Sequence, residues 1–103
     1  MLGQVFGGER VSLAGRVDAQ TVARVREKLD SAIALGDGPL VVELARVDII
    51  DATGLGMLVA AQQRAVRAGR RIVLSGTPER FARLLRVTRL DRVLPDEAAL
   101  AAA

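Results

Sequence analysis

Residues 47–58 of this chain read VDIIDATGLGML, and this stretch decides the fold. An apolar strand ends on Asp51, and a turn of small residues with Gly54 and Gly56 leads directly into a helix. At such a strand-to-helix junction, free helix N–H groups and an acidic side chain meet at the surface. Function in small α/β domains is usually located at these junctions, outside the carboxyl ends of strands.

Strands and helices alternate on both sides of this junction, in the order β-β-α-β-α-β-α-β-α. The alternation implies right-handed crossovers and a mostly parallel central sheet, and the pattern alone leaves open whether helices cover one face or both. Asp18 is expected to cap the first helix, Thr77 and Pro78 the third, and Asp96 a terminal one, while Gly69 ends the second. The predicted strands of this order are residues 4–6, 9–14, 40–44, 71–75 and 92–95, and the predicted helices are 22–33, 55–68 and 78–88.

Composition excludes several classes of function. With 103 residues, half of them hydrophobic, the chain is expected to form one domain, residues 1–103, with a core of its own. It has no cysteine, which removes the thiolate nucleophile and Cys-based metal sites, and no histidine, which removes the commonest general base and metal ligand. We therefore expect no enzyme, no metal and no cofactor. No run of residues is long and apolar enough to span a membrane, which favours a soluble, cytoplasmic protein, monomeric or weakly dimeric.

Fourteen of the fifteen basic residues are arginines, and nine of these lie between residues 64 and 92. They form either a basic face for an acidic partner or an ordinary solvated helix surface. The chain has no Tyr or Trp to stack on bases, so we expect no nucleic-acid partner and favour an acidic protein.

The junction also has a purely structural interpretation. Asp51 or Thr53 would cap the helix, and Gly54 and Gly56 would permit tight turning and close packing of helix on sheet. No lysine follows in the position of a phosphate-binding loop, so the glycines do not indicate a nucleotide site.

The segment as a whole resembles the STAS domain of bacterial anti-sigma-factor antagonists. That family carries Asp-Ser-Ser/Thr-Gly-Leu-Gly after its central strand, where this chain has residues 51–56, DATGLG. The resemblance extends to residues 15–18, GRVD, in place of the family's Gly-Glu-Leu-Asp, with Arg16 replacing an acid, and to the order of the elements around residues 68–78. It implies a four- or five-stranded sheet, mostly parallel or mixed, with helices on one side.

The same resemblance implies a regulator of transcription. In the family, the unphosphorylated antagonist binds an anti-sigma factor of the serine-kinase type and frees a sigma factor, and phosphorylation of the antagonist breaks that complex. For two residues a structural role is as plausible: Asp18 as a helix cap and Met57 as core filler. Asp51 either positions the kinase's metal-nucleotide or holds the turn. The resemblance thus implies a partner-binding set of Asp18, Asp51, Ala52, Thr53, Gly54 and Met57.

This chain departs from the family at the phosphoacceptor, which directly follows the aspartate and is Ala52 here. Alanine has no hydroxyl, so either Thr53 accepts the phosphate, or the protein binds constitutively, or the alanine is an introduced substitution. A second function within the fold is a STAS adaptor subunit of a lipid-transport ATPase complex, since such subunits often have altered residues in this motif.

Overall fold

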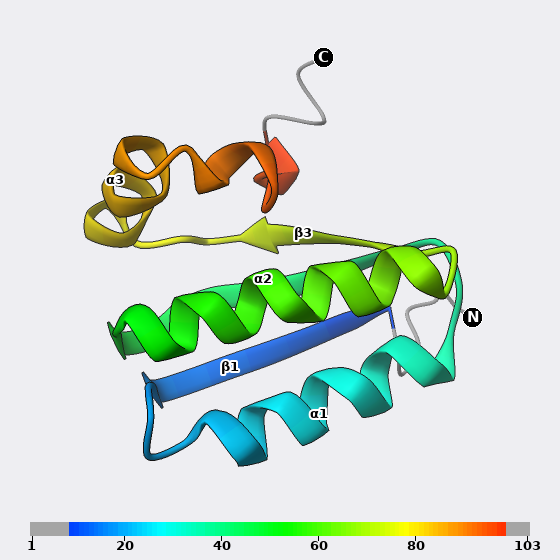
Figure 1. Cartoon of the computed structure of the whole chain (residues 1–103). Helices are drawn as coiled ribbons and strands as arrows, with labels where there is room; N and C mark the ends of the chain where they lie inside the picture. Colours follow the sequence, from blue (N-terminus) through cyan, green and yellow to red (C-terminus); the bar gives the residue numbers. More distant parts are fainter. Residues whose placement is uncertain (1–8, 99–103) are drawn as a thin grey trace.

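The computed structural model describes residues 9–98, which fold into a parallel sheet with helices packed against it (Figure 1). Both pairs of neighbouring strands are parallel, in the spatial order β1-β2-β3. The elements in chain order are β1 (Arg10–Val17), α1 (Val22–Leu35), β2 (Pro39–Ile50), α2 (Ala52–Arg67), β3 (Arg71–Ser75), α3 (Glu79–Val87) and the 3₁₀ turn η1 (Leu90–Arg92).

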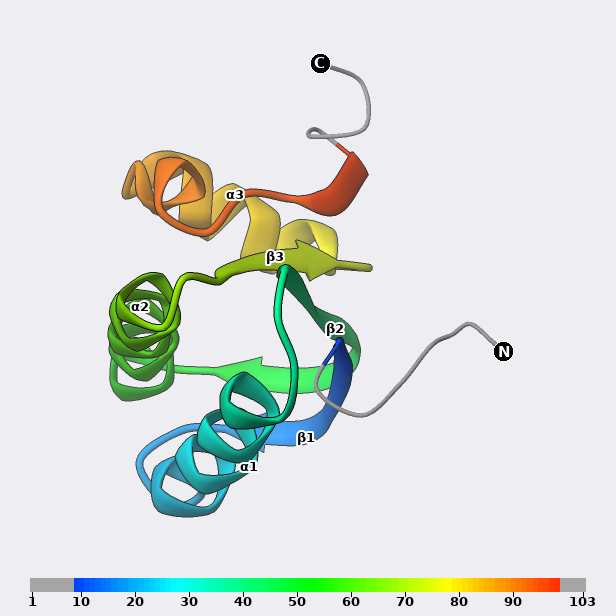
Figure 2. The ribbon, with the colours of Figure 1, turned by 90° about the vertical axis from the view of Figure 1, so that its right-hand side faces the viewer.

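Helices α1 and α2 lie on the same face of the sheet, and α3 lies beyond β3 (Figure 2). In the first half of β2 inward residues alternate with outward ones, and Leu40, Val42 and Leu44 are buried. Leu29 of α1 and Leu58 of α2 meet these side chains in one core. The α/β class and the helix positions predicted from the sequence are confirmed.

The sheet has fewer strands in the described residues than the four or five expected. The predicted strand at residues 4–6 lies outside the described residues. The predicted strand at 92–95 is wrong: Arg92 is the last residue of the turn η1, residues 93–95 form no strand, and only Asp96 forms a bridge, to Leu74. Pro95 accepts a hydrogen bond from the Leu74 N–H at 2.8 Å.

A buried glutamine replaces the missing strand along the free edge of β3. The Gln62 side chain accepts the Ile72 N–H at 2.8 Å and donates to the Ile72 carbonyl at 2.9 Å and to the Val93 carbonyl at 2.7 Å. The backbone groups of Ile72 are thereby satisfied without a neighbouring strand, as buried polar groups must be. Gln62 therefore joins α2, β3 and the segment after η1.

Two predicted helix caps are also wrong, and one helix end is confirmed. Helix α1 begins at Val22 with no side-chain cap, three residues beyond the position that Asp18 would have set. Thr77 does not cap α3 either, and its hydroxyl is buried without a partner among the described residues. Helix α2 does end before Gly69, whose φ of 78° is a left-handed conformation that glycine adopts readily. The terminal helix predicted after Asp96 lies mostly outside the described residues.

Candidate functional site

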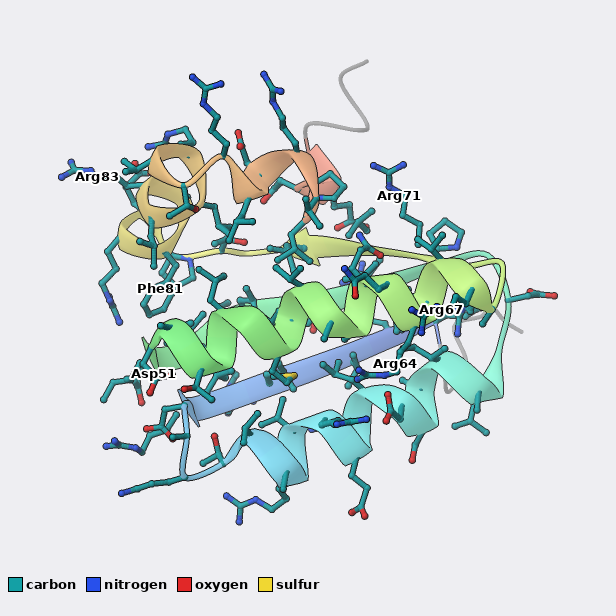
Figure 3. All side chains as sticks on the ribbon, viewed as in Figure 1. Asp51, Arg64, Arg67, Arg71, Phe81 and Arg83 are labelled. Carbon is teal, nitrogen blue, oxygen red and sulfur yellow. The ribbon has the colours of Figure 1, made fainter. Side chains whose placement is uncertain are left out.

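The junction between β2 and α2 is built around the carboxylate of Asp51. Its Oδ1 accepts the Gly54 N–H at 2.8 Å, and its main-chain carbonyl accepts the Leu55 N–H at 2.9 Å. Asp51 is therefore the N-cap of α2, and of the two candidates from the sequence it is this residue, not Thr53, that caps. In Figure 3 Asp51 lies at the start of α2, below the labelled side chain of Phe81.

Gly54 brings the first turn of α2 against the end of β1. A Cβ atom at this position would lie 2.0 Å from the carbonyl oxygen of Val17, which no side chain can tolerate. Gly56 has no such role, because a Cβ there would meet nothing within 4 Å. The prediction of close helix–sheet packing is thus right for Gly54 and wrong for Gly56. Gly54 is itself buried, so it shapes the site and offers no side chain to a partner.

The loop after β1 is attached to this junction. The Ala19 N–H donates to Oδ2 of Asp51 at 3.3 Å, and the Asp51 N–H donates to the Val17 carbonyl at 3.4 Å. Two loops that are distant in sequence therefore share one carboxylate. This contact places residues 17–19 beside the start of α2, as the resemblance implied for Asp18.

Asp18 organises its own loop. The residue is 3% exposed, and its carboxylate accepts the Gln20 N–H at 3.0 Å and pairs with the Arg16 guanidinium at 2.6 Å. Burial by itself would raise the pKa of Asp18, but the Arg16 hydrogen bond and charge and the backbone N–H groups outweigh it and lower the pKa. With its carboxylate enclosed in this way, Asp18 is a positioning residue of the loop.

Ala52 and Thr53 are the exposed residues of the first turn of α2. The N–H groups of these two positions precede the first intrahelical bond, so they face outward with the positive end of the helix dipole. Within the described part of the chain, the Thr53 hydroxyl makes no hydrogen bond, because Asp51 has taken the capping role. Both side chains are therefore accessible for contact, and the Thr53 hydroxyl is accessible for modification.

Met57 lies one turn further along α2 and is buried, with 6% of its surface exposed. It packs in the core, which is the structural role considered for it, and its side chain is not presented to a partner. Of the six residues singled out from the sequence, the structure thus brings Asp18, Asp51, Ala52, Thr53 and Gly54 together at the surface end of two strands and sends Met57 inward.

Sequence reasoning did not single out Arg80, which reaches the same end of the sheet from α3. Its guanidinium donates to the Asp48 carbonyl at 2.6 Å and lies 4.5 Å from the centre of the Phe81 ring. No sequence signal distinguishes it, because it is one of nine arginines in the same segment.

The junction presents a helix N-terminus with small, exposed side chains. The described residues contain no cluster of three or more acidic side chains that could hold a metal ion. None of the helices that the structure describes has the length and apolar character needed to cross a bilayer. A capped helix N-terminus with outward N–H groups suits an anionic group or a closely packed partner.

Comparison with known proteins agrees with this geometry. A family model described as Mlab, STAS domain, matches residues 2–95. An anti-sigma-B factor antagonist of Listeria monocytogenes serovar 1/2a is 31% identical over 84 residues, which cover 82% of this chain and 74% of the relative. A protein of the same name from Staphylococcus epidermidis is also 31% identical, with 82% and 78% of the two chains covered.

Solved structures with more distant sequences share the fold. The unphosphorylated anti-sigma factor antagonist SpoIIAA has a TM-score of 0.62 at 20% identity, covering 81% of this chain and 78% of that chain. A sulfate transporter family protein from Wolinella succinogenes has a TM-score of 0.67 at 22% identity, covering 88% and 75%. A Thermotoga maritima protein reaches 0.72 at 21% identity, covering 88% and 80%.

Proposed function

This chain belongs to the STAS domain family, and on that premise we propose that it is an anti-sigma-factor antagonist. It binds an anti-sigma factor of the serine-kinase type through the junction of β2 and α2 and so frees a sigma factor for transcription. It carries out no chemistry of its own. The curated relatives that it matches are named anti-sigma-B factor antagonists, which supports this role over that of an enzyme.

The observation that carries the proposal is the exposed first turn of α2, capped by Asp51. Ala52 and Thr53 are exposed, while Gly54 holds the turn against β1 and Asp51 fixes the adjoining loop through the Ala19 N–H. Such a rigid, small-residue surface allows a partner to approach the helix N-terminus closely. The partner-contacting residues are Ala52 and Thr53, with Asp51, Asp18 and Gly54 holding them in place.

Ala52 alters the phosphoswitch. A phosphate on the family's acceptor would add nearly two negative charges at a surface that must be dehydrated on binding. The phosphate would also lie beside the like charge of Asp51. Burying both charges under the anti-sigma factor would be costly, so binding of that partner would be strongly weakened. With a methyl group at position 52 this cannot happen, and the remaining hydroxyl at the site is that of Thr53. The protein therefore either binds constitutively or is switched through Thr53.

The test uses the chain as bait in lysate of the source organism, and bound proteins are identified by mass spectrometry. A second sample of the captured complex is treated with Mg-ATP, and the protein that is released is measured. We expect a kinase-type anti-sigma factor that stays bound to the wild-type protein. Ala52→Ser restores an acceptor, so Mg-ATP should phosphorylate this variant and release it. Ala52→Gly is the matched control, since it changes the same side chain without adding a hydroxyl.

Two further results would identify the phosphoacceptor or refute the proposal. If Mg-ATP releases the wild-type protein as well, and Thr53→Val abolishes this release, then Thr53 is the acceptor. If no anti-sigma factor is recovered under conditions in which a known antagonist captures its own, the proposal is wrong.

Ala52 favours a second candidate, an adaptor subunit of a lipid-transport ATPase complex. Such an adaptor needs the same docking surface without a phosphoacceptor. Recovery of a membrane-transport ATPase in place of the kinase would establish this alternative. The junction would then still be the proposed docking surface, with a different partner.

A further inference from the structure

Helix α3 presents an outward stripe that mixes positive charge with aliphatic surface. Its members are spaced i, i+3, i+4 and i+7, so they share one face of the helix. Phe81 and Leu85 are buried on the opposite face. Leu84 is 38% exposed and Val87 is 74% exposed. We call this set the α3 stripe: Arg80, Arg83, Leu84 and Val87.

The charges of the α3 stripe are not neutralised by its neighbours. Arg86, outside the stripe, pairs with Glu79 at 2.8 Å and lowers the pKa of that carboxyl, and Arg83 contributes a weaker effect of its charge. In the described residues Arg83 forms no ion pair, and in Figure 3 it points away from the body of the molecule while Phe81 points toward α2. The stripe thus keeps a net positive charge.

Arg89, just past the end of α3, has an unusual backbone conformation. Its φ of 63° is left-handed, and it is the one non-glycine residue with positive φ among residues 9–98. The position follows the helix end, where glycine is the favoured residue because it avoids the steric strain of a Cβ atom. A strained position occupied by a long cationic side chain suggests that the side chain has a use of its own.

We propose that the α3 stripe with Arg89 is a docking surface for an acidic region of a protein partner. Guanidinium groups bind carboxylates through paired hydrogen bonds, and the aliphatic members give the contact an apolar centre. The stripe has no aromatic residue on which bases could stack, and two aliphatic side chains give too little apolar area to hold a membrane.

The α3 stripe adjoins the junction, because Arg80 is bonded to the Asp48 carbonyl three residues before Asp51. One partner can therefore cover both surfaces. This extends the proposed function, on which it rests: the anti-sigma factor would place carboxylates against α3 while it covers Ala52 and Thr53.

The first experiment needs no knowledge of the partner. A synthetic helical peptide with glutamates and leucines along one face is titrated into the ¹⁵N-labelled chain at low salt. We expect NMR shifts centred on residues 80–89. Arg89→Gly should weaken binding by about two- to fivefold, the worth of one exposed charge pair, while its unfolding midpoint stays the same or rises. Val87→Ser should weaken binding without affecting the salt dependence.

Arg67→Gln is the matched control, because it removes one positive charge from an exposed arginine at the far end of α2 (Figure 3). If it weakens peptide binding as much as Arg89→Gly, the attraction is a general effect of net charge and the proposal fails. It also fails if phosphatidylglycerol vesicles or an oligothymidylate shift residues 80–89 more strongly than the peptide does.

A second experiment separates this inference from the proposed function. The affinity of the captured anti-sigma factor is measured for the wild-type, Thr53→Glu and Arg89→Gly proteins. Weaker binding of both variants supports the two proposals together. If only Thr53→Glu is impaired, the α3 docking surface is refuted and the junction stands. If only Arg89→Gly is impaired, the junction is refuted and the α3 surface stands.

Discussion

Two glycines in α2, only two residues apart, differ in what surrounds them. Gly54 faces β1, where a Cβ would lie 2.0 Å from the Val17 carbonyl oxygen, and Gly56 faces open space. At this scale, a hydrogen atom in place of a methyl group determines how closely α2 can approach β1. The position of Ala52 and Thr53 depends on that approach, because both precede Gly54 in the same turn.

We therefore predict opposite effects of the two alanine substitutions on stability. Gly54→Ala should lower the free energy of unfolding by about 1–3 kcal/mol or more, the cost of overpacking a close contact. Gly56→Ala should raise it by about 0.5–1 kcal/mol, because alanine favours the helix and meets no clash. Urea denaturation of the two variants measures both. Equal effects would contradict the assigned contact with Val17.

At the scale of the elements, a buried arginine fastens the end of α1 to the start of β3. Arg70 is 4% exposed. Its guanidinium donates hydrogen bonds to the carbonyls of Ala32 at 2.8 Å and Gly38 at 2.9 Å. Ala32 lies in the last turn of α1, where the negative end of the helix dipole attracts a cation. Not every arginine of residues 64–92 therefore contributes to a basic surface.

Arg70→Met should consequently destabilise the protein by about 2–3 kcal/mol, since buried carbonyl groups lose a charged donor. The neighbouring Arg71 is exposed, so Arg71→Met should change the free energy of unfolding by less than about 0.5 kcal/mol. Hydrogen exchange adds a local readout: the amides of residues 32–36 should lose protection in the first variant only. Equal destabilisation by both substitutions would show that the hydrogen bonds of Arg70 are not the cause.

The stability of the whole molecule should depend on pH through the pair of Arg16 and Asp18. The pKa of Asp18 is lowered below its ordinary value in the folded chain, so the ionised carboxylate stabilises the fold at neutral pH. Because the folded pKa is the lower one, this stabilisation is present above the unfolded pKa and is lost as pH falls through the folded pKa.

Arg16→Gln removes the main groups that lower the pKa of Asp18, so that pKa should rise. The variant should then lose less stability than the wild type when the pH falls from 5 to the acid range below about 4. Denaturation at several pH values measures this difference, and the pair of Glu79 and Arg86 is common to both proteins and cancels. Parallel pH profiles of the two proteins would contradict the assigned role of Arg16.

The sequence by itself determined the α/β class, the parallel sheet and the location of the junction. These follow from local periodicity and from short-range chemistry, such as an aspartate three residues before the N–H group that it caps. Strand β3 and the C-terminal end of helix α2 were predicted closely for this reason, since Gly69 and the apolar run of β3 act locally, while α2 begins three residues before the predicted start at Leu55.

The tertiary structure alone decided which of several similar residues has which role. Nothing local separates Arg70, which is buried, from Arg71, which is exposed, or Gly54 from Gly56, because burial depends on segments distant in the chain. The same holds for Asp18, whose carboxylate is enclosed by its loop, and for Gln62, which occupies the edge of β3 where a strand was expected. Such assignments depend on long-range packing and hydrogen-bond satisfaction, which only the folded arrangement of α1, α2 and the sheet specifies.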